Sequence, residues 1–214
     1  MDVLKYAHEN GCPWDEVTCH MAAKYGHLDV LQYAHKNGCP WNLWTCSNAA
    51  ANGHLGVLKY LHENGCPWNE NTCWEASKEG HLDVLKYAHE NGCPWESRAF
   101  EIALVHGRVN IIKFLHKKGC PCYAGVRNCD DAARRGDLDL LKCLREIGCP
   151  WGQSTCKKAA EGGHLDVLKY ARENRCPWDR RLCQSIAEAR GHPHVVEWLE
   201  HHGLKRTRFM EAPL

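Results

Sequence analysis

The chain has 214 residues, with 27 Lys and Arg against 26 Asp and Glu. Because these charges nearly cancel, the composition gives no electrostatic reason to expect binding to nucleic acid or to an anionic membrane. No apolar run approaches the ~20 residues of a membrane-spanning helix, and the first residues lack the basic and apolar regions of a secretory signal. We therefore expect an intracellular protein, in the cytoplasm or nucleus, whose 15 cysteines stay reduced.

One internal repeat runs through the chain. The cysteines of the motif GCP and the glycines of the motif GH both recur about every 27 residues, and the two series keep step. The motif cysteines are Cys12, Cys39, Cys66, Cys93, Cys120, Cys149 and Cys176. This regularity predicts a single repeat array over residues 1–203, with about seven units of which the first is incomplete, and a C-terminal tail over residues 204–214.

Each unit is expected to hold two short helices. After residues 1–10, which read as the second helix of a unit, the first helix of the next unit should begin behind a capping residue and end near a GH glycine. The expected caps are Asp15, Asn42, Asn69 and Asp179. The second helix, LDVLKYAHEN at 82–91, has apolar residues at three- and four-residue steps, and Pro94 follows its end.

Neither predicted helix exceeds about twelve residues, a length that is only marginally helical in water by itself. Stacked pairs can bury each other's apolar stripes, so we expect an all-α helix-turn-helix solenoid. Regularity fails in two places. A two-residue insertion accompanies Cys122, which replaces the usual tryptophan, so we expect poorer packing there, and Pro193 interrupts the last unit.

The segment AANGHLGVLKYLHENGC at 50–66 resembles the helix-turn-helix half of the ankyrin repeat. Ankyrin units have 33 residues, and the missing six would come from the β-hairpin finger. The resemblance therefore implies stacked ankyrin-like repeats with short loops in place of β-hairpin fingers. It also implies that Cys19, Cys46 and Cys73 occupy a position where the family has leucine. The fold alone does not specify a function.

Cysteine and histidine recur in every unit, so a metal-stabilised or thiol-redox array is the alternative interpretation. Zinc sites need four N or S ligands, commonly with C-x(2–4)-C pairs, whereas here the spacing is C-x(6)-C. Phe100 replaces one cysteine. Arg145 and Arg172 replace the histidine near the end of the second helix, and Arg108 and Asp137 replace the histidine of the GH motif. Because these positions vary independently, we expect the motif NGCPW to be structural. Its cysteine would fill apolar space and its tryptophan would lie at the junction between units.

No catalytic motif is recognised, so we expect neither an enzyme nor a cofactor. A scaffold that binds a protein partner, as a monomer, is the predicted function. The residues around the cysteine of the first helix vary between units, which is typical of positions free to specialise, although drift on a solvated face would give the same variation. The expected partner-binding residues are His20, Met21, Trp44, Asn48, Trp74, Glu75, Glu101, Asp131, Lys157 and Lys158.

Overall fold

The computed structural model describes residues 2–122 and 125–202. Within these ranges the secondary structure is helical and contains no strand. The chain divides into two compact units, residues 1–123 and residues 124–214. This division falls in the stretch where the sequence repeat is irregular. The predicted tail, residues 204–214, lies outside the described residues.

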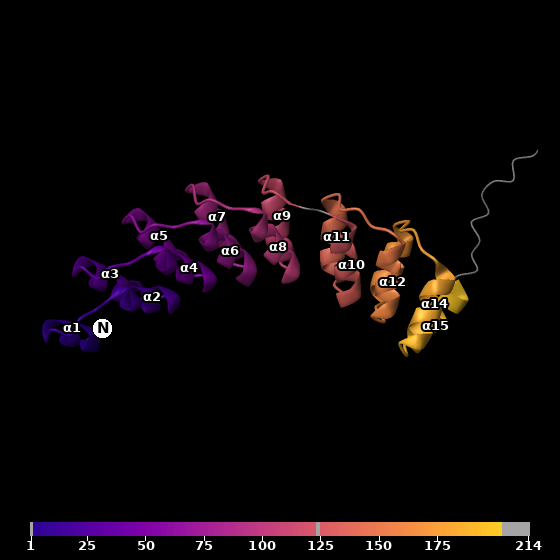
Figure 1. The fold of residues 1–214 in the computed structure, drawn as a ribbon, viewed down its shortest axis with the longest axis horizontal. Helices are drawn as coiled ribbons and strands as arrows, with labels where there is room; N and C mark the ends of the chain where they lie inside the picture. Colours follow the sequence, from indigo (N-terminus) through magenta and orange to yellow (C-terminus); the bar gives the residue numbers. More distant parts are fainter. Residues whose placement is uncertain (1, 123–124, 203–214) are drawn as a thin grey trace, which may run out of the picture. The chain divides into compact units, whose positions relative to one another are not determined.

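Helices follow one another as short antiparallel pairs (Figure 1). The first unit holds α1 (Asp2–Glu9), α2 (Glu16–Lys24), α3 (Leu28–Lys36), α4 (Leu43–Ala51), α5 (Leu55–Glu63), α6 (Glu70–Glu79), α7 (Leu82–Glu90), α8 (Ser97–Val105) and α9 (Val109–Lys117). The second unit holds α10 (Val126–Arg135), α11 (Leu138–Glu146), α12 (Gln153–Glu161), α13 (Leu165–Glu173), α14 (Arg180–Ala189) and α15 (Pro193–His202).

The predicted helix ends are confirmed. The side chains of Asp15, Asn42, Asn69 and Asp179 each accept a hydrogen bond from a backbone N–H in the first turn that follows. At the other end of α6, Gly80 takes a left-handed conformation with φ 93°, which glycine adopts without steric cost. Pro193 is the first residue of α15, a helical position that tolerates proline because its N–H would have no intrahelical partner.

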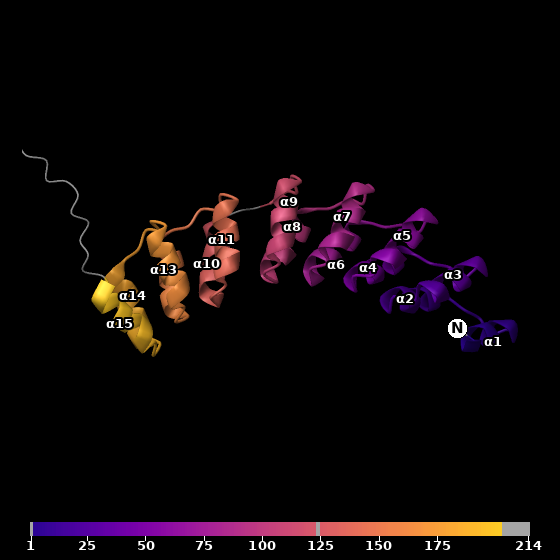
Figure 2. The same ribbon diagram turned by 180° about the vertical axis from the view of Figure 1, so that it is seen from behind.

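Stacking of neighbouring pairs builds the core of each unit. In the first unit the first helices α2, α4, α6 and α8 pack in a row, and the second helices α3, α5 and α7 form another row, as both faces of the ribbon show (Figures 1 and 2). Val84, Leu85 and Ala88 on α7 are fully buried, as are Cys73 and Ala76 on α6. The predicted helical solenoid of mutually covering hairpins is therefore confirmed.

The cysteines link successive repeats as well as filling space. Cys93 Sγ lies 3.3 Å from the carbonyl oxygen of Asn69, the residue that caps α6, and Cys66 Sγ makes the same contact with Asn42 at 3.5 Å. Cys39, Cys120 and Cys176 repeat the arrangement, always with a carbonyl 24 residues earlier. The thiol donates in each case, because a carbonyl can only accept. The buried thiol was predicted, but its role as a donor was not.

Within each unit, aromatic side chains cover the junctions between repeats, which confirms the position predicted for tryptophan. In the first unit, His62 stacks on Trp68 with ring centroids 4.1 Å apart, and the edge of Tyr87 from the next repeat meets Trp68 at 6.3 Å. His62 Nδ1 lies 3.0 Å from the Tyr87 hydroxyl. In the second unit, guanidinium groups replace the imidazoles: Arg145 lies 4.4 Å above Trp151 and Arg172 lies 4.3 Å above Trp178. Arginine keeps the planar stacking contact and adds a cation–π attraction.

The GH motif connects repeats in a similar way. His81 Nε2 donates to the carbonyl of Ala51, near the end of α4, at 3.2 Å. Its ring also lies so close to Gly53 that a Cβ there would come within 2.6 Å of it. Where arginine replaces the histidine, Arg108 Nε donates to the carbonyl of Lys78 at 2.9 Å. Gly53 and Gly80 thus make room for the side chain of the following repeat that caps the helix before them.

Candidate partner-binding surface

The first helices leave one face uncovered by the stacking. We define this first-helix face by counting from the buried cysteine of each first helix, or from Phe100 in α8. It consists of the side chain two positions before that residue and the side chains one, two and five positions after it. Positions separated by three or four residues lie on one side of a helix, so these side chains share a surface. Its members in the first unit are Val17, His20, Met21, Lys24, Trp44, Asn48, Ala51, Asn71, Trp74, Glu75, Lys78, Arg98, Glu101, Ile102 and Val105, whereas Ser47 at the same repeat position is buried. In the second unit they are Arg127, Asp130, Asp131, Arg134, Ser154, Lys157, Lys158, Glu161, Arg181, Gln184, Ser185 and Glu188.

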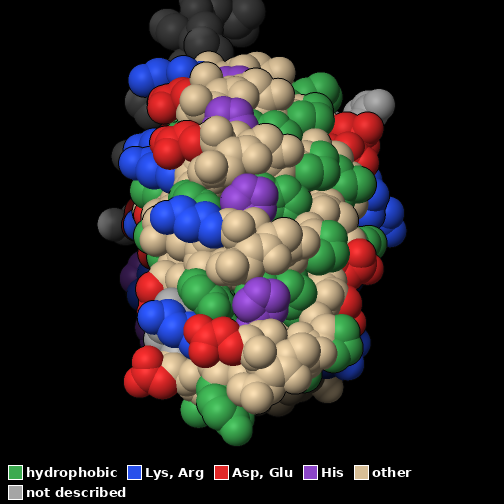
Figure 3. Space-filling model, turned by 90° about the vertical axis from the view of Figure 1, so that its left-hand side faces the viewer, with side chains coloured by type: hydrophobic (Ala, Val, Ile, Leu, Met, Phe, Trp, Pro, Cys, Tyr) green, Lys and Arg blue, Asp and Glu red, His purple; other side chains and the backbone are tan. Residues whose placement is uncertain are grey.

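On α2 and α4, the first-helix face carries three exposed apolar side chains. Trp44 is 61% exposed, Val17 is 54% exposed and Met21 is 43% exposed, and α2 packs directly against α4. Met21 and Trp44 were predicted from their variation between repeats. Val17 was missed, although it occupies the same repeat position as Trp44. An end-on view of the surface shows a different repeated feature, a regularly spaced column of histidines with hydrophobic side chains beside it (Figure 3).

Two predicted residues near this patch have structural partners. His20 is half-buried, and its Nε2 lies 2.8 Å from Asn42 Oδ1, the atom that also caps α4. Asn48 is also half-buried, and its carbonyl accepts a hydrogen bond from the side chain of Asn52. Both residues therefore border the apolar patch and offer less free surface than Trp44.

On α6 and α8, the face becomes charged. Lys78 Nζ lies 5.3 Å from the centroid of the Trp74 ring and Arg98 Cζ lies 6.0 Å from it, so cations from two helices adjoin the half-buried indole. Lys78 also contacts Glu75 at 3.7 Å. Burial raises the pKa of Glu75, and the nearby Lys78 opposes the increase. Glu101 on α8 is exposed.

In the second unit, ion pairs occupy much of the face. Asp131 pairs with Arg134 at 3.1 Å and Lys158 with Glu161 at 2.8 Å. The Lys158 ammonium lowers the pKa of the Glu161 carboxyl. Lys157 is exposed. The predicted binding residues are thus divided, seven in the first unit and three in the second.

Residues 19–62, which run from α2 to α5, match the family model described as ankyrin repeats (many copies). This match and the stacked helix pairs fit an ankyrin-like repeat protein. No sequence among the curated proteins matches it. Ankyrin repeats generally act as protein-interaction scaffolds and are typically not enzymes.

Burial favours the protonated form of two thiols of this ankyrin-like array, Cys120 and Cys129. Burial raises the pKa of Cys120 to about 11 and that of Cys129 to about 12. Since the thiolate is both the metal ligand and the nucleophile, these cysteines are poorly suited to either role. In residues 2–122 and 125–202, no group of three or more His, Cys, Asp or Glu side chains could hold a metal ion. No helix in the same ranges is both long enough and apolar enough to cross a lipid bilayer.

Proposed function

We propose that this ankyrin-like array is a non-catalytic scaffold that binds a protein partner through its first-helix face. The observation that carries the proposal is the exposure of Val17, Met21 and Trp44 on two adjoining helices. Contiguous exposed apolar side chains are uncommon on monomeric proteins unless they serve an interaction. Tryptophan is also the residue most enriched among those that dominate binding energy. Trp44 is therefore the proposed central anchor.

Charged residues next to this anchor would supply the rim of the interface. Trp74, Glu75 and Glu101 continue the face along α6 and α8, and a polar rim around an apolar centre is the usual arrangement in interfaces. His20 and Asn48 would line the border of the patch. Asp131, Lys157 and Lys158 would offer a second, charged contact region on the other unit.

The proposed setting is the reducing interior of a cell, the cytoplasm or nucleus, with the protein acting as a monomer and without a cofactor. The thiol hydrogen bonds support this setting, because a thiol loses its proton when it forms a disulfide and could no longer donate to the carbonyl of the preceding repeat. The near balance of charge supports a protein partner over nucleic acid or membrane. We also propose that residues 1–203 serve as one array, with residues 204–214 as a separate tail.

The test is affinity enrichment from the native cell with quantitative mass spectrometry, comparing the unchanged chain with a Trp44→Ala/Trp74→Ala double variant. The amount of partner captured by the double variant should fall at least about tenfold. This change corresponds to about 1.4 kcal/mol of binding free energy. Helix content should be retained, since Trp44 is largely exposed.

The matched control is Glu63→Ala/Glu90→Ala, which removes two exposed side chains from the ends of the second helices α5 and α7. This variant should retain the partner. Equal capture by the tryptophan variant and the unchanged chain would contradict the proposed site. Turnover of a substrate by the purified chain would contradict the non-catalytic role.

A further inference from the structure

The first-helix face of the second unit carries three exposed cations, Arg127 on α10, Lys157 on α12 and Arg181 on α14. Within residues 2–122 and 125–202, no ion pair, hydrogen bond or ring contact involves any of these three side chains. We call these three residues the free basic row.

The carboxylates on the same face, by contrast, already have donors. Asp131 pairs with Arg134 at 3.1 Å. Glu161 pairs with Lys158 at 2.8 Å and with Arg190 at 2.9 Å. Both acidic groups are thus neutralised by other cations of the chain and supply no counter-charge to the free basic row.

The two remaining carboxylates of this face accept hydrogen bonds from neutral groups. Asp130 Oδ1 accepts from the Thr155 hydroxyl at 2.7 Å, and Glu188 Oε1 accepts from the Gln184 amide at 3.0 Å. Each acidic group of the face therefore has a donor, whereas the cations of the free basic row have no acceptor in the described part of the chain.

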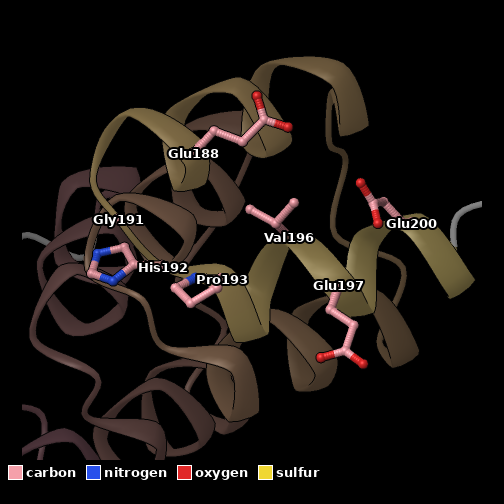
Figure 4. A pocket seen from close by; sticks show the side chains of 7 residues that line it. All are labelled: Glu188, Gly191, His192, Pro193, Val196, Glu197 and Glu200. Atoms are coloured by element: carbon pink, nitrogen blue, oxygen red, sulfur yellow. The ribbon is translucent and has the colours of Figure 1, made fainter.

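Other glutamates of the last helix pair lie outside the face. Glu188 borders an open pocket of about 440 Å³ together with Glu197 and Glu200, and the latter two belong to the second helix α15 (Figure 4). Neither of them forms an ion pair with the free basic row where the structure describes the chain. This acidic pocket is therefore separate from the basic surface.

The free basic row spans three adjoining helices. α10 packs against α12, and α12 packs against α14. Since packed helices lie about 8–10 Å apart, the row extends over about 20 Å, a distance that about six extended residues of a polypeptide can cover. An occupant that matches the row must therefore bring anionic groups at intervals of about three residues.

Separate carboxylates suit this surface better than the continuous charge of a nucleic acid. Asp131, Glu161 and Glu188 share the face with the free basic row, and they would oppose the dense, evenly spaced phosphates of a nucleic acid. An acidic polypeptide can place its carboxylates opposite the cations alone. Guanidinium groups also bind carboxylates through two parallel hydrogen bonds, which favours Arg127 and Arg181 as contact points.

We propose that an acidic, extended segment of the partner protein binds the free basic row, with its carboxylates paired to Arg127, Lys157 and Arg181. This inference rests on the proposed function, because it assigns the chemistry of the charged contact region on the second unit. The apolar patch around Trp44 and the free basic row then recognise different parts of the partner, one apolar and one acidic.

Fluorescence anisotropy of a labelled peptide titrated with the full chain tests this proposal. The probe is a peptide of about twelve residues with alternating glutamate and serine, which is long enough to cover the row. Arg127→Glu/Lys157→Glu/Arg181→Glu should weaken binding of the probe at least about tenfold, because three ion pairs that are individually weak are all reversed. Arg127→Gln/Lys157→Gln/Arg181→Gln should weaken it less, because this variant removes attraction without adding repulsion. Circular dichroism should show unchanged helix content in both variants, since the three side chains are exposed.

The matched control is Lys36→Glu/Lys86→Glu/Lys169→Glu, which reverses three exposed lysines on the second helices α3, α7 and α13. Its net charge changes by the same amount as that of the glutamate variant, so it should bind the probe as the unchanged chain does. An equal loss of affinity in this control would overturn the proposal, because net charge alone would then explain binding. No binding of the probe to the unchanged chain would also overturn it.

A single-stranded RNA of similar length provides the comparison with nucleic acid. Tighter binding of this RNA that depends on the same three residues would contradict an acidic polypeptide as the occupant. Partner enrichment separates this inference from the proposed function. A partner that is lost with Trp44→Ala/Trp74→Ala but retained by the glutamate variant would leave the proposed function in place and overturn the acidic segment.

Discussion

Replacing Arg175 by glycine should stabilise the second unit. Arg175 has φ 63°, and it is the only residue other than glycine with positive φ in residues 2–122 and 125–202. The equivalent position in other repeats is glycine, for example Gly65 with φ 78° and Gly92 with φ 82°. Since a Cβ in this region approaches the following carbonyl, arginine is strained here and glycine is not.

The expected magnitude is the difference between two effects. The left-handed conformation costs a residue with a Cβ roughly 1–2 kcal/mol, and Arg175→Gly removes that cost. Glycine also gives the unfolded chain more freedom, which opposes the gain by about 0.4–1 kcal/mol. The variant should therefore gain about 0.5–1 kcal/mol in its free energy of unfolding. For a unit of this size the melting temperature should rise by about 3–6 °C.

Urea unfolding followed by circular dichroism measures this change directly. The reciprocal variant Gly65→Arg recreates Arg175's local sequence, N-R-C-P-W, in the first unit, and it should lose a similar free energy. The reasoning would be refuted if Arg175→Gly left the free energy of unfolding unchanged or lowered it, while Gly65→Arg lowered it. It would mean that the Arg175 side chain makes stabilising contacts that outweigh the strain.

Two further predictions concern the contacts between repeats. His81→Ala removes the donor to the Ala51 carbonyl and should lower the free energy of unfolding by about 1 kcal/mol. His81→Arg should retain most of the stability, because Arg108 makes the same bond in another repeat. Urea unfolding measures both variants, and equal losses of free energy would contradict the capping role of His81. Alkaline pH should destabilise the fold, because the pKa of Cys120 is raised from about 9 to about 11. The unfolded thiol ionises first, so the contribution of Cys120 to stability is complete below about pH 9 and falls by about 1.4 kcal/mol per pH unit up to about pH 11. Cys120→Ser should reduce this pH dependence, and an unchanged slope would contradict the assignment.

Most of the fold could be predicted from the repeat itself. Asn42 and Asn69 are recognisable helix caps because they stand at the same distance before each apolar helix. The identity of the hydrogen-bond partners could not be predicted in this way. That Cys93 donates to the carbonyl of Asn69 depends on the rotation and spacing of successive hairpins, which no local pattern specifies. The left-handed Arg175 was likewise visible only as a change of letter in the repeated motif.

The candidate site was predictable in part. Variation between repeats singled out Met21 and Trp44, and both are exposed. The same comparison also selected His20, whose ring contacts the cap of the next helix, because variability does not reveal what a neighbouring helix covers. Val17 was not predicted as a partner-binding residue because valine is usually a core residue. Only its equivalence to Trp44 in the repeat indicates that it lies on the surface.

The capping of each first helix by the following repeat makes the 27-residue unit interchangeable. If residues 54–80 were removed, His81 would follow Gly53 directly and would meet the carbonyl of Lys24, which His54 occupies in the intact chain. The connections made by His54, His81, His164 and His192 join the same two chemical groups, an imidazole and a backbone carbonyl near the end of the preceding first helix. A gene with this property can gain or lose whole copies by recombination, because the newly adjacent repeats already carry groups that can bond to each other. The length of the protein can therefore change faster than its architecture.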